Sequence, residues 1–288
     1  MVTTTAVWAS ASSILRAKLP TGFALAALFF SMSGGLPAMS AEKLAQKPPL
    51  VVAHRGGKQW APENTMAAFK KSLAAKVDGI ELDIHVCKSG ELVVIHDDTL
   101  ERTTNGTGPV GDADWKDLSK LDAGTWYKAE FKDERLPLLK DVLDAVQGKL
   151  TINVEIKNCP SNYAAIDTKL LTLLDKYPYP DKIIISSFDH KVLKKIHDQT
   201  TKYKLALLGD SVFYDLPAYA KTVGATAWNT DFDCVRADTV KDAHDAGLQV
   251  NTWTVNAKDG WKKACALGVD SIITDDPQGL RDYLKEAK

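Results

Sequence analysis

Residues 79–96 read GIELDIHVCKSGELVVIH, and this stretch decides how many strands the sheet contains. Residues 79–86 have the apolar pattern of a buried strand, and residues 92–96 form a second short apolar run. The linker between the two runs, residues 87–91, has hairpin length and a glycine at the turn. Because parallel neighbours need a crossover of about a dozen residues or more, the second run is predicted to be an antiparallel excursion.

The rest of the chain alternates short apolar runs with longer amphipathic segments, which is typical of βαβ units and a parallel sheet. Without the excursion, the candidate strands match a closed (β/α)8 barrel in number, and residues 48–288 match its usual size of about 250 residues. The predicted barrel strands are 50–54, 79–86, 150–156, 183–188, 205–208, 225–229, 249–255 and 271–274.

The predicted barrel forms one domain, residues 41–288, with no internal repeat or low-complexity linker. Residues 98–140 follow the second strand and its excursion and are rich in Gly, Asp, Thr and Trp. We expect them to form a small insertion packed over one end of the barrel.

The N-terminal 40 residues have the pattern of a secretory signal peptide. Arg16 and Lys18 precede the apolar run 23–32, and the small residues around 38–41 form a cleavage site. The alternative is an uncleaved membrane anchor, but the apolar run is shorter than the ~20 residues that span a bilayer. The prediction is therefore a periplasmic or secreted protein without stable membrane insertion.

The charge balance argues against a nucleic-acid partner. The chain has 36 basic and 37 acidic residues, for a formal net charge of −1. Such a chain has no long-range field to attract nucleic acid or anionic lipid, so any affinity for anions must be local. Its cysteines form no CxxC pair, which argues against a zinc site.

Three acidic residues predict a divalent metal site. Glu81 and Asp83 lie two apart on one predicted strand, so their side chains point to the same face. Adjacent carboxylates repel each other unless a cation or proton lies between them, and Ca²⁺ or Mg²⁺ prefers oxygen ligands. Glu155 repeats the arrangement on the next barrel strand, with Lys157 on the same face. The alternatives are a solvated acid pair for the first two and a salt bridge between Glu155 and Lys157.

Two histidines and an arginine lie near these acids. His54 ends the first predicted strand and His96 ends the hairpin, and imidazole titrates near neutral pH. A lone histidine is more often structural, but a pair at strand ends near three acids indicates general acid–base catalysis. Arg55 and Lys157 are the predicted phosphate ligands.

An ordered set of short motifs extends over essentially the whole predicted mature chain. The motifs are His54-Arg55-Gly56, Ala61-Pro62-Glu63-Asn64-Thr65, Gly79-Ile80-Glu81-Leu82-Asp83, His96-Asp97, Glu155-Ile156-Lys157, Ser187-Phe188, Trp253-Thr254-Val255-Asn256 and Ile273-Thr274-Asp275-Asp276-Pro277. Together they resemble the glycerophosphodiester phosphodiesterase family.

The resemblance implies a (β/α)8 barrel enzyme that hydrolyses glycerophosphodiesters to glycerol 3-phosphate and an alcohol. It implies the following roles: metal ligands Glu81, Asp83 and Glu155; acid–base pair His54 and His96; phosphate ligands Arg55 and Lys157; and glycerol-pocket residue Trp253. Of the histidines, His54 is assigned as the base and His96 as the acid. Core packing is the alternative for Trp253, and Glu63 and His85 are expected to support the site rather than react.

Two other functions fit the same barrel. One is cleavage of a lysophospholipid or sphingolipid head group, which would call for an apolar groove, and the other is phosphodiester binding without catalysis. The spacing also suggests a Cys87–Cys159 disulfide. Each of these cysteines lies four residues beyond an acid of the metal site.

Overall fold

The computed structural model describes residues 47–287, so the predicted signal peptide at residues 1–40 lies outside the described residues. Within this range eight parallel strands close into a barrel, because β1 pairs with both β9 and β2. The strands are β1 Leu50–Ala53, β2 Gly79–Val86, β3 Leu92–Val94, β4 Thr151–Ile156, β5 Ile183–Ser187, β6 Lys204–Gly209, β7 Ala227–Asp231, β8 Gln249–Trp253 and β9 Ser271–Thr274.

The barrel and the hairpin are both confirmed. β3 pairs antiparallel with β2 through Ile84↔Val94 and Val86↔Leu92, so it lies beside the barrel as a ninth, extra strand. The prediction placed the ends of several strands one or two residues away from those observed. β3, for example, stops at Val94, before His96, which lies in the segment that follows.

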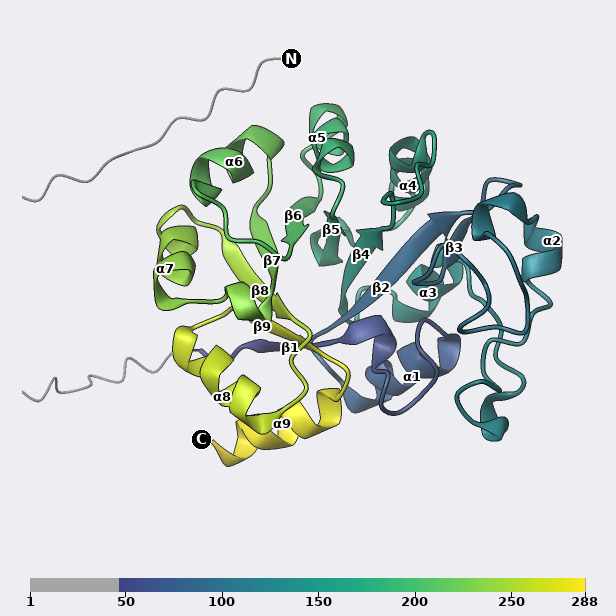
Figure 1. Ribbon diagram of the computed structural model, residues 1–288, viewed down its shortest axis with the longest axis horizontal. Helices are drawn as coiled ribbons and strands as arrows, with labels where there is room; N and C mark the ends of the chain where they lie inside the picture. Colours follow the sequence, from purple (N-terminus) through teal and green to yellow (C-terminus); the bar gives the residue numbers. More distant parts are fainter. Residues whose placement is uncertain (1–46, 288) are drawn as a thin grey trace, which may run out of the picture. The chain divides into compact units, whose positions relative to one another are not determined.

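Helices surround the strands (Figure 1). The α-helices are α1 Met66–Ala75, α2 Trp115–Leu118, α3 Leu139–Val146, α4 Ile166–Leu174, α5 His190–Gln199, α6 Leu216–Val223, α7 Ala237–Asp245, α8 Lys258–Leu267 and α9 Pro277–Glu286. Short 3₁₀ turns are η1 His54–Gly56, η2 Val110–Asp112, η3 Ala129–Phe131, η4 Pro180–Lys182 and η5 Phe232–Cys234. Among the described residues, no helix combines the length and apolar character needed to cross a membrane.

The start of α1 shows how local sequence sets the helix boundaries. Thr65 has an extended backbone, and its hydroxyl accepts a hydrogen bond from the Ala68 N–H, which satisfies one of the free donors of the first turn. Phe69 then falls on the inner face of the helix and is fully buried against the barrel. The capping residue and the apolar spacing therefore set where α1 begins, after η1 and the loop that follow the first strand.

The segment between β3 and α3 has its own apolar cluster, which includes Val110, Leu118 and Leu136. Cys87 is buried in this cluster, and its thiol lies 3.1 Å from Glu91 Oε2. The predicted Cys87–Cys159 disulfide is wrong, because both cysteines are free and Cys159 is exposed. The β2–β3 turn carries Cys87 into this apolar cluster, whereas Cys159 is exposed in the segment that follows β4.

β2 is buried along its entire length. Leu82 and Ile84 belong to the apolar cluster between the barrel and its helices, so the alternating residues Glu81 and Asp83 face the other way. The strand therefore places the carboxylates of Glu81 and Asp83 inside the barrel, where they are buried from water.

Candidate active site

A cavity of about 140 Å³ lies at the carboxyl ends of the barrel strands. Seven of the predicted site residues line this cavity: His54, Arg55, Glu81, His96, Glu155, Lys157 and Trp253. The other residues that line it are Asn153, Phe188, Leu208, Thr254 and Ile273. In (β/α)8 barrels this end of the strands is where active sites lie.

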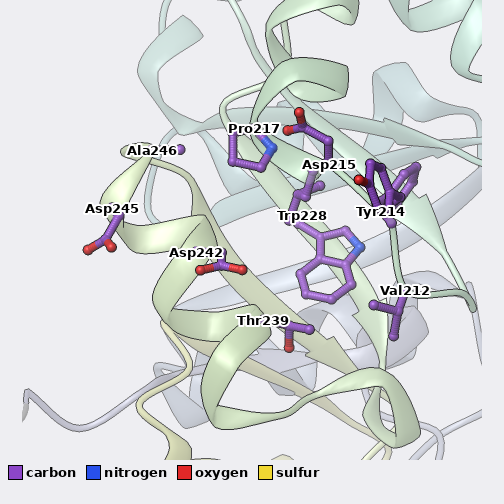
Figure 2. Close-up of a pocket in the computed structure, with 11 residues that line it drawn as sticks. Val212, Tyr214, Asp215, Pro217, Trp228, Thr239, Asp242, Asp245 and Ala246 are labelled. Carbon is purple, nitrogen blue, oxygen red and sulfur yellow. The ribbon is translucent and has the colours of Figure 1, made fainter.

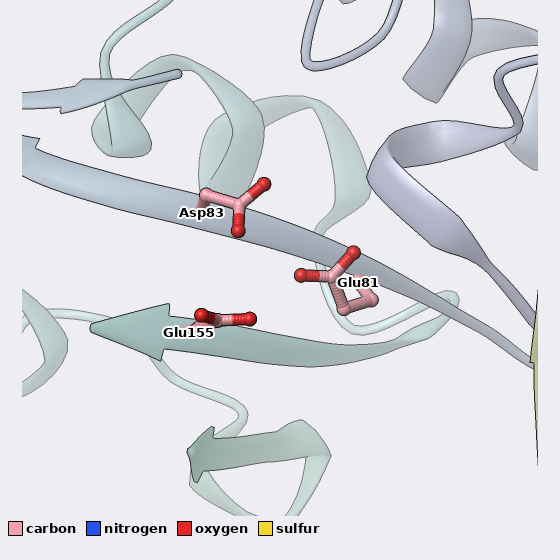
Figure 3. Close-up of side chains that lie close together, drawn as sticks. All are labelled: Glu81, Asp83 and Glu155. Carbon is pink, nitrogen blue, oxygen red and sulfur yellow. The ribbon is translucent and has the colours of Figure 1, made fainter. Parts of the chain in front are cut away.

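The three predicted metal ligands form one buried cluster (Figure 3). Asp83 and Glu155 are direct partners in the pairing of β2 with β4, and Glu81 lies one inward position earlier on β2. One oxygen from each of the three lies within 4.8 Å of the others. Glu81 Oε1 is buried and has no hydrogen-bond partner among the described residues. An all-oxygen cluster with an unpaired buried acceptor fits a hard divalent cation such as Ca²⁺ or Mg²⁺.

The electrostatics of the cluster support this fit. Burial, together with repulsion from Asp83 and Glu155, raises the pKa of Glu81 well above its ordinary value. Burial and the charge of Asp83 also raise the pKa of Glu155 to about 7. Burial alone would raise the pKa of Asp83 as well, but Arg55 and Lys157 outweigh it and lower that pKa to about 2. Without a cation, the cluster must therefore retain protons that the same groups would lose in water.

Arg55 connects the first strand to the acidic cluster. Its backbone N–H donates to Glu81 Oε2 at 2.9 Å, and its Nη1 donates to Glu63 Oε1 at 2.6 Å. The Nε atom is buried without a hydrogen-bond partner among the described residues and lies 3.6 Å from Asp83 Oδ2. Glu63 thus contacts and orients Arg55, and it precedes α1 rather than lying in its first turn.

Gly56 ends the short turn η1, which also contains Arg55, and its lack of a side chain makes this turn possible. It has a φ of +81°, and a Cβ there would lie 2.8 Å from Ala68 Cβ and 2.9 Å from Phe69 Cδ1. We expect Gly56→Ala to lower the free energy of unfolding by about 1–3 kcal/mol through overpacking, beyond the cost of the positive φ. Urea unfolding measures this.

Gly108→Ala is the matched control, because Gly108 has a φ of +88° but a Cβ there would have no atom within 4 Å. Equal losses of stability in the two variants would contradict the steric explanation.

Each predicted catalytic histidine is held by a carboxylate. His54 Nδ1 lies 2.6 Å from Asp275 Oδ1, and His96 Nδ1 lies 2.6 Å from Asp97 Oδ1. A carboxylate accepts a hydrogen bond, so the Nδ1 atoms carry the protons and each Nε2 is left for other contacts. Nε2 of His54 lies 3.9 Å from Glu81 Oε2. Burial lowers the pKa of both histidines.

Lys157 lies between the acidic cluster and His96. Its ammonium donates to Glu155 Oε1 at 2.8 Å and lies 3.2 Å from His96 Nε2 and 3.8 Å from Asp83 Oδ1. The predicted salt bridge with Glu155 is therefore present alongside the cluster.

His85 does not line the cavity. It is 2% exposed, with Nε2 2.9 Å from the carbonyl oxygen of His96 and Nδ1 2.8 Å from the Tyr163 hydroxyl. Through the first contact it holds the backbone that carries His96.

Several residues of the site were given no role by the sequence, among them Asp97, Phe188, Asp275 and Arg102. Asp275 follows β9, and the pairing of β9 with β1 brings it to His54. The sequence feature that could have identified Asp275 is its position in the last motif, directly after the strand that closes the barrel. Arg102 joins Asp97 to the buried Glu63 at 2.6–3.0 Å, and no local pattern marked it.

One wall of the cavity is apolar. Trp253 and Phe188 meet edge to face with ring centroids 5.9 Å apart, and Leu208 lies on the same cavity. The indole N–H of Trp253 donates to the Asn229 carbonyl oxygen at 3.2 Å, which fixes the ring. The cavity thus pairs a charged side with an apolar side.

Comparisons with known proteins agree with this arrangement. Residues 54–279 match the model of the glycerophosphoryl diester phosphodiesterase family. A glycerophosphodiester phosphodiesterase from Caldanaerobacter subterraneus subsp. tengcongensis is 36% identical over 238 residues, which cover 82% of this chain and 98% of the relative.

Solved structures share the fold. A glycerophosphodiester phosphodiesterase from Agrobacterium tumefaciens gives a TM-score of 0.70 at 28% identity and covers 80% of this chain and 97% of its own. A phosphodiesterase from Oleispira antarctica, solved with the product sn-glycerol-3-phosphate, gives a TM-score of 0.78 at 24% identity. That match covers 83% of this chain and 97% of the other.

Proposed function

Because the chain belongs to the glycerophosphoryl diester phosphodiesterase family, we propose that it hydrolyses glycerophosphodiesters to glycerol 3-phosphate and an alcohol. The observation that carries this proposal is one cavity that combines an acidic cluster, two carboxylate-held histidines, two cationic side chains and an apolar wall. A phosphodiester needs the cations and the acid–base groups, and the carbon side of glycerol fits the apolar wall.

Two groups of residues in the cavity stabilise the phosphoryl group in this proposal, the acidic cluster through a bound cation and the two cationic side chains directly. Glu81, Asp83 and Glu155 would hold a Ca²⁺ or Mg²⁺ ion, which supplies Lewis-acid stabilisation of the phosphoryl group when bound. Arg55 and Lys157 stabilise the charge that develops on the phosphoryl oxygens. The Nε of Arg55 supports this role, because it is a buried donor that has no acceptor among the residues that the structure describes.

The histidines move the protons in this proposal. His54, beside Glu81, removes the proton of the attacking oxygen, and His96 protonates the leaving alkoxide. The hydrogen bonds to Asp275 and Asp97 keep each ring in one orientation and leave Nε2 as the reactive atom. Trp253 and Phe188 pack against the glycerol carbons.

We expect Asp275→Asn to lower turnover by up to about 10²-fold, because His54 loses the charged partner that orients it. Burial lowers the pKa of His54 below its ordinary 6.5, and the Asp275 hydrogen bond partly offsets this. Loss of the carboxylate therefore lowers that pKa further. A neutral His54 base then persists to lower pH, so the acid limb of kcat/KM moves to lower pH.

The measurement is the pH profile of kcat/KM for the wild type and the variant. Asp276→Asn is the matched control, because Asp276 caps α9 instead of contacting His54 and asparagine also caps helices. An acid limb that stays in place or moves to higher pH in Asp275→Asn would contradict the assignment of His54 as the base.

Release of glycerol 3-phosphate from glycerophosphocholine tests the proposed function directly. The reaction is run with Ca²⁺, with Mg²⁺ and with a chelator, and metal-dependent release is the expected result. Release of choline from lysophosphatidylcholine, with none from glycerophosphocholine, would instead support the lipid-head-group enzyme. Saturable binding of glycerophosphocholine by folded protein without turnover would support a binding protein.

The same proposal puts the enzyme outside the cytoplasm, in the periplasm or secreted, after removal of residues 1–40. The support is the basic, apolar and small-residue pattern of that segment. N-terminal sequencing of the protein from its host is expected to begin near residue 41. A mature chain that begins at Met1 would overturn this part of the proposal.

A further inference from the structure

A second cavity, of about 430 Å³, lies on the outer wall of the barrel between α6 and α7. Within the described part of the chain, it shares no lining residue with the active-site cavity. Trp228 of β7 lines it from the barrel side, whereas the next residue, Asn229, lines a small cavity inside the barrel. Successive strand residues point to opposite faces, so Trp228 faces the helices and not the catalytic centre.

Aromatic and acidic residues both line this outer cavity, and in Figure 2 Asp242 and Asp245 lie on one side of Trp228 and Tyr214 on the other. Phe213 and the fully exposed Tyr214 lie in the loop between β6 and α6. Asp242 and Asp245 belong to α7, and Asp215 precedes α6. Three carboxylates beside aromatic rings make the cavity attractive to a cation and repulsive to an anion such as a phosphodiester.

The three carboxylates of the cavity differ in the ion-pair and hydrogen-bond partners that they have within the protein. Asp245 pairs with Lys241, and Asp215 accepts a hydrogen bond from the Ala218 N–H at 3.0 Å. Asp242, in contrast, has no ion-pair partner among residues 47–287. Its charge is therefore available to a cation that enters the cavity.

Trp228 provides an independent sign of a ligand. The residue is 1% exposed, and its indole N–H has no hydrogen-bond partner in the described part of the chain. A buried donor without an acceptor is destabilising, so it indicates an acceptor that the protein itself does not supply. In Figure 2 the indole nitrogen lies on the side of the ring that faces Val212 and Tyr214, which both line the cavity.

We propose that this cavity binds a small organic cation of the amino-alcohol class. The hydroxyl oxygen of such a ligand accepts the hydrogen bond from the Trp228 indole. Its ammonium group lies beside Asp242 and Asp245, and its methyl or methylene groups pack against Tyr214. The proposal is independent of the proposed hydrolytic function, because this binding requires none of the residues of the active site.

Isothermal titration of the protein with choline tests the cationic requirement. We expect saturable binding in the wild type and about tenfold weaker binding in Asp242→Asn/Asp245→Asn. The control Asp144→Asn/Asp282→Asn removes the same charge from exposed sites on α3 and α9, and its dissociation constant is expected to be unchanged. The neutral isostere 3,3-dimethyl-1-butanol is expected to bind at least about tenfold more weakly than choline.

Trp228→Phe tests the hydrogen bond, because it keeps an aromatic ring and removes the indole N–H. Choline is expected to bind about three- to tenfold more weakly to this variant. Tetramethylammonium, which lacks the hydroxyl, is expected to bind the wild type and Trp228→Phe equally well. The Asp242→Asn/Asp245→Asn result decides the matter if Trp228→Phe does not fold.

Saturating glycerol 3-phosphate separates this site from the active site, and the affinity for choline is expected to stay the same in its presence. Displacement of choline by glycerol 3-phosphate would locate the binding in the active site and overturn the proposal. The proposal also fails if choline gives no saturable binding, or if the neutral isostere binds as tightly as choline does.

Discussion

Replacement of either His54 or His96 by alanine is expected to lower turnover of a glycerophosphodiester by about 10²-fold or more. Each imidazole is partly buried, is held by a carboxylate through Nδ1 and lines the active-site cavity. Loss of the ring removes a proton-transfer group from the transition state and leaves the acidic cluster in place. Steady-state kinetics with glycerophosphocholine measures the effect on kcat and KM.

His244→Ala is the control for this pair. His244 is exposed on α7, contacts Asp270 and lies outside the active-site cavity, so its removal is expected to leave kcat unchanged. Near-wild-type turnover by His54→Ala or His96→Ala would remove that residue from the proposed acid–base pair. A rise in KM alone would instead indicate a role in substrate binding.

Glu81→Gln is expected to lower metal-dependent turnover by about 10³-fold, because the cation loses one of three carboxylates and contributes several kcal/mol of charge stabilisation. The amide retains the shape of the side chain and an oxygen that accepts the Arg55 N–H, so the backbone turn is preserved. Kinetics at increasing Ca²⁺ or Mg²⁺ measures the loss. Wild-type turnover at saturating cation would contradict the assignment of Glu81 as a ligand.

The same variant is expected to stabilise the metal-free protein at neutral pH. The pKa of Glu81 is raised well above its ordinary 4.5, and that of Glu155 is raised to about 7. Between the unfolded and folded pKa values of these two carboxyls, the folded chain holds protons on them that the unfolded chain has lost, so their contribution to stability falls as pH rises from about 4.5 through 7. The lowered pKa values of His54, His85 and His96 act in the opposite direction, so the contribution of Glu81 is the difference between the wild type and Glu81→Gln. Glu81→Gln removes one of the two groups and reduces this loss.

Thermal unfolding in the presence of a chelator, followed from pH 4.5 to 8, measures the effect. Added Ca²⁺ or Mg²⁺ is expected to raise Tm in the wild type at neutral pH and to raise it much less in Glu81→Gln. A difference in Tm between Glu81→Gln and the metal-free wild type that does not grow as pH rises over this range would contradict the buried repulsive cluster.

The barrel was predictable because its evidence is local. Linker lengths separate parallel crossovers from the hairpin at residues 87–91, and alternation along a strand places Glu81 and Asp83 on one face. The cluster with Glu155 follows from two such strands in register. These inferences depend on spacings of a few residues, which can be read directly from the sequence.

The disulfide prediction failed for a related reason. It extended the register of β2 and β4 four residues past the acids, but β2 turns into β3 there and Cys87 packs with Val93 and Ile95. A spacing argument holds only as long as both strands continue.

By itself the sequence determined the barrel, its extra strand and the common face of the acids, since strand alternation and connection length are properties of neighbouring residues. Tertiary structure alone decided which distant residues contact and orient the side chains of the active site. Asp275 reaches His54 across 221 positions only because β9 closes the barrel against β1. Arg102 reaches Glu63, and the Trp228 indole has no acceptor among residues 47–287, because side chains from distant segments pack together there, which no local spacing encodes.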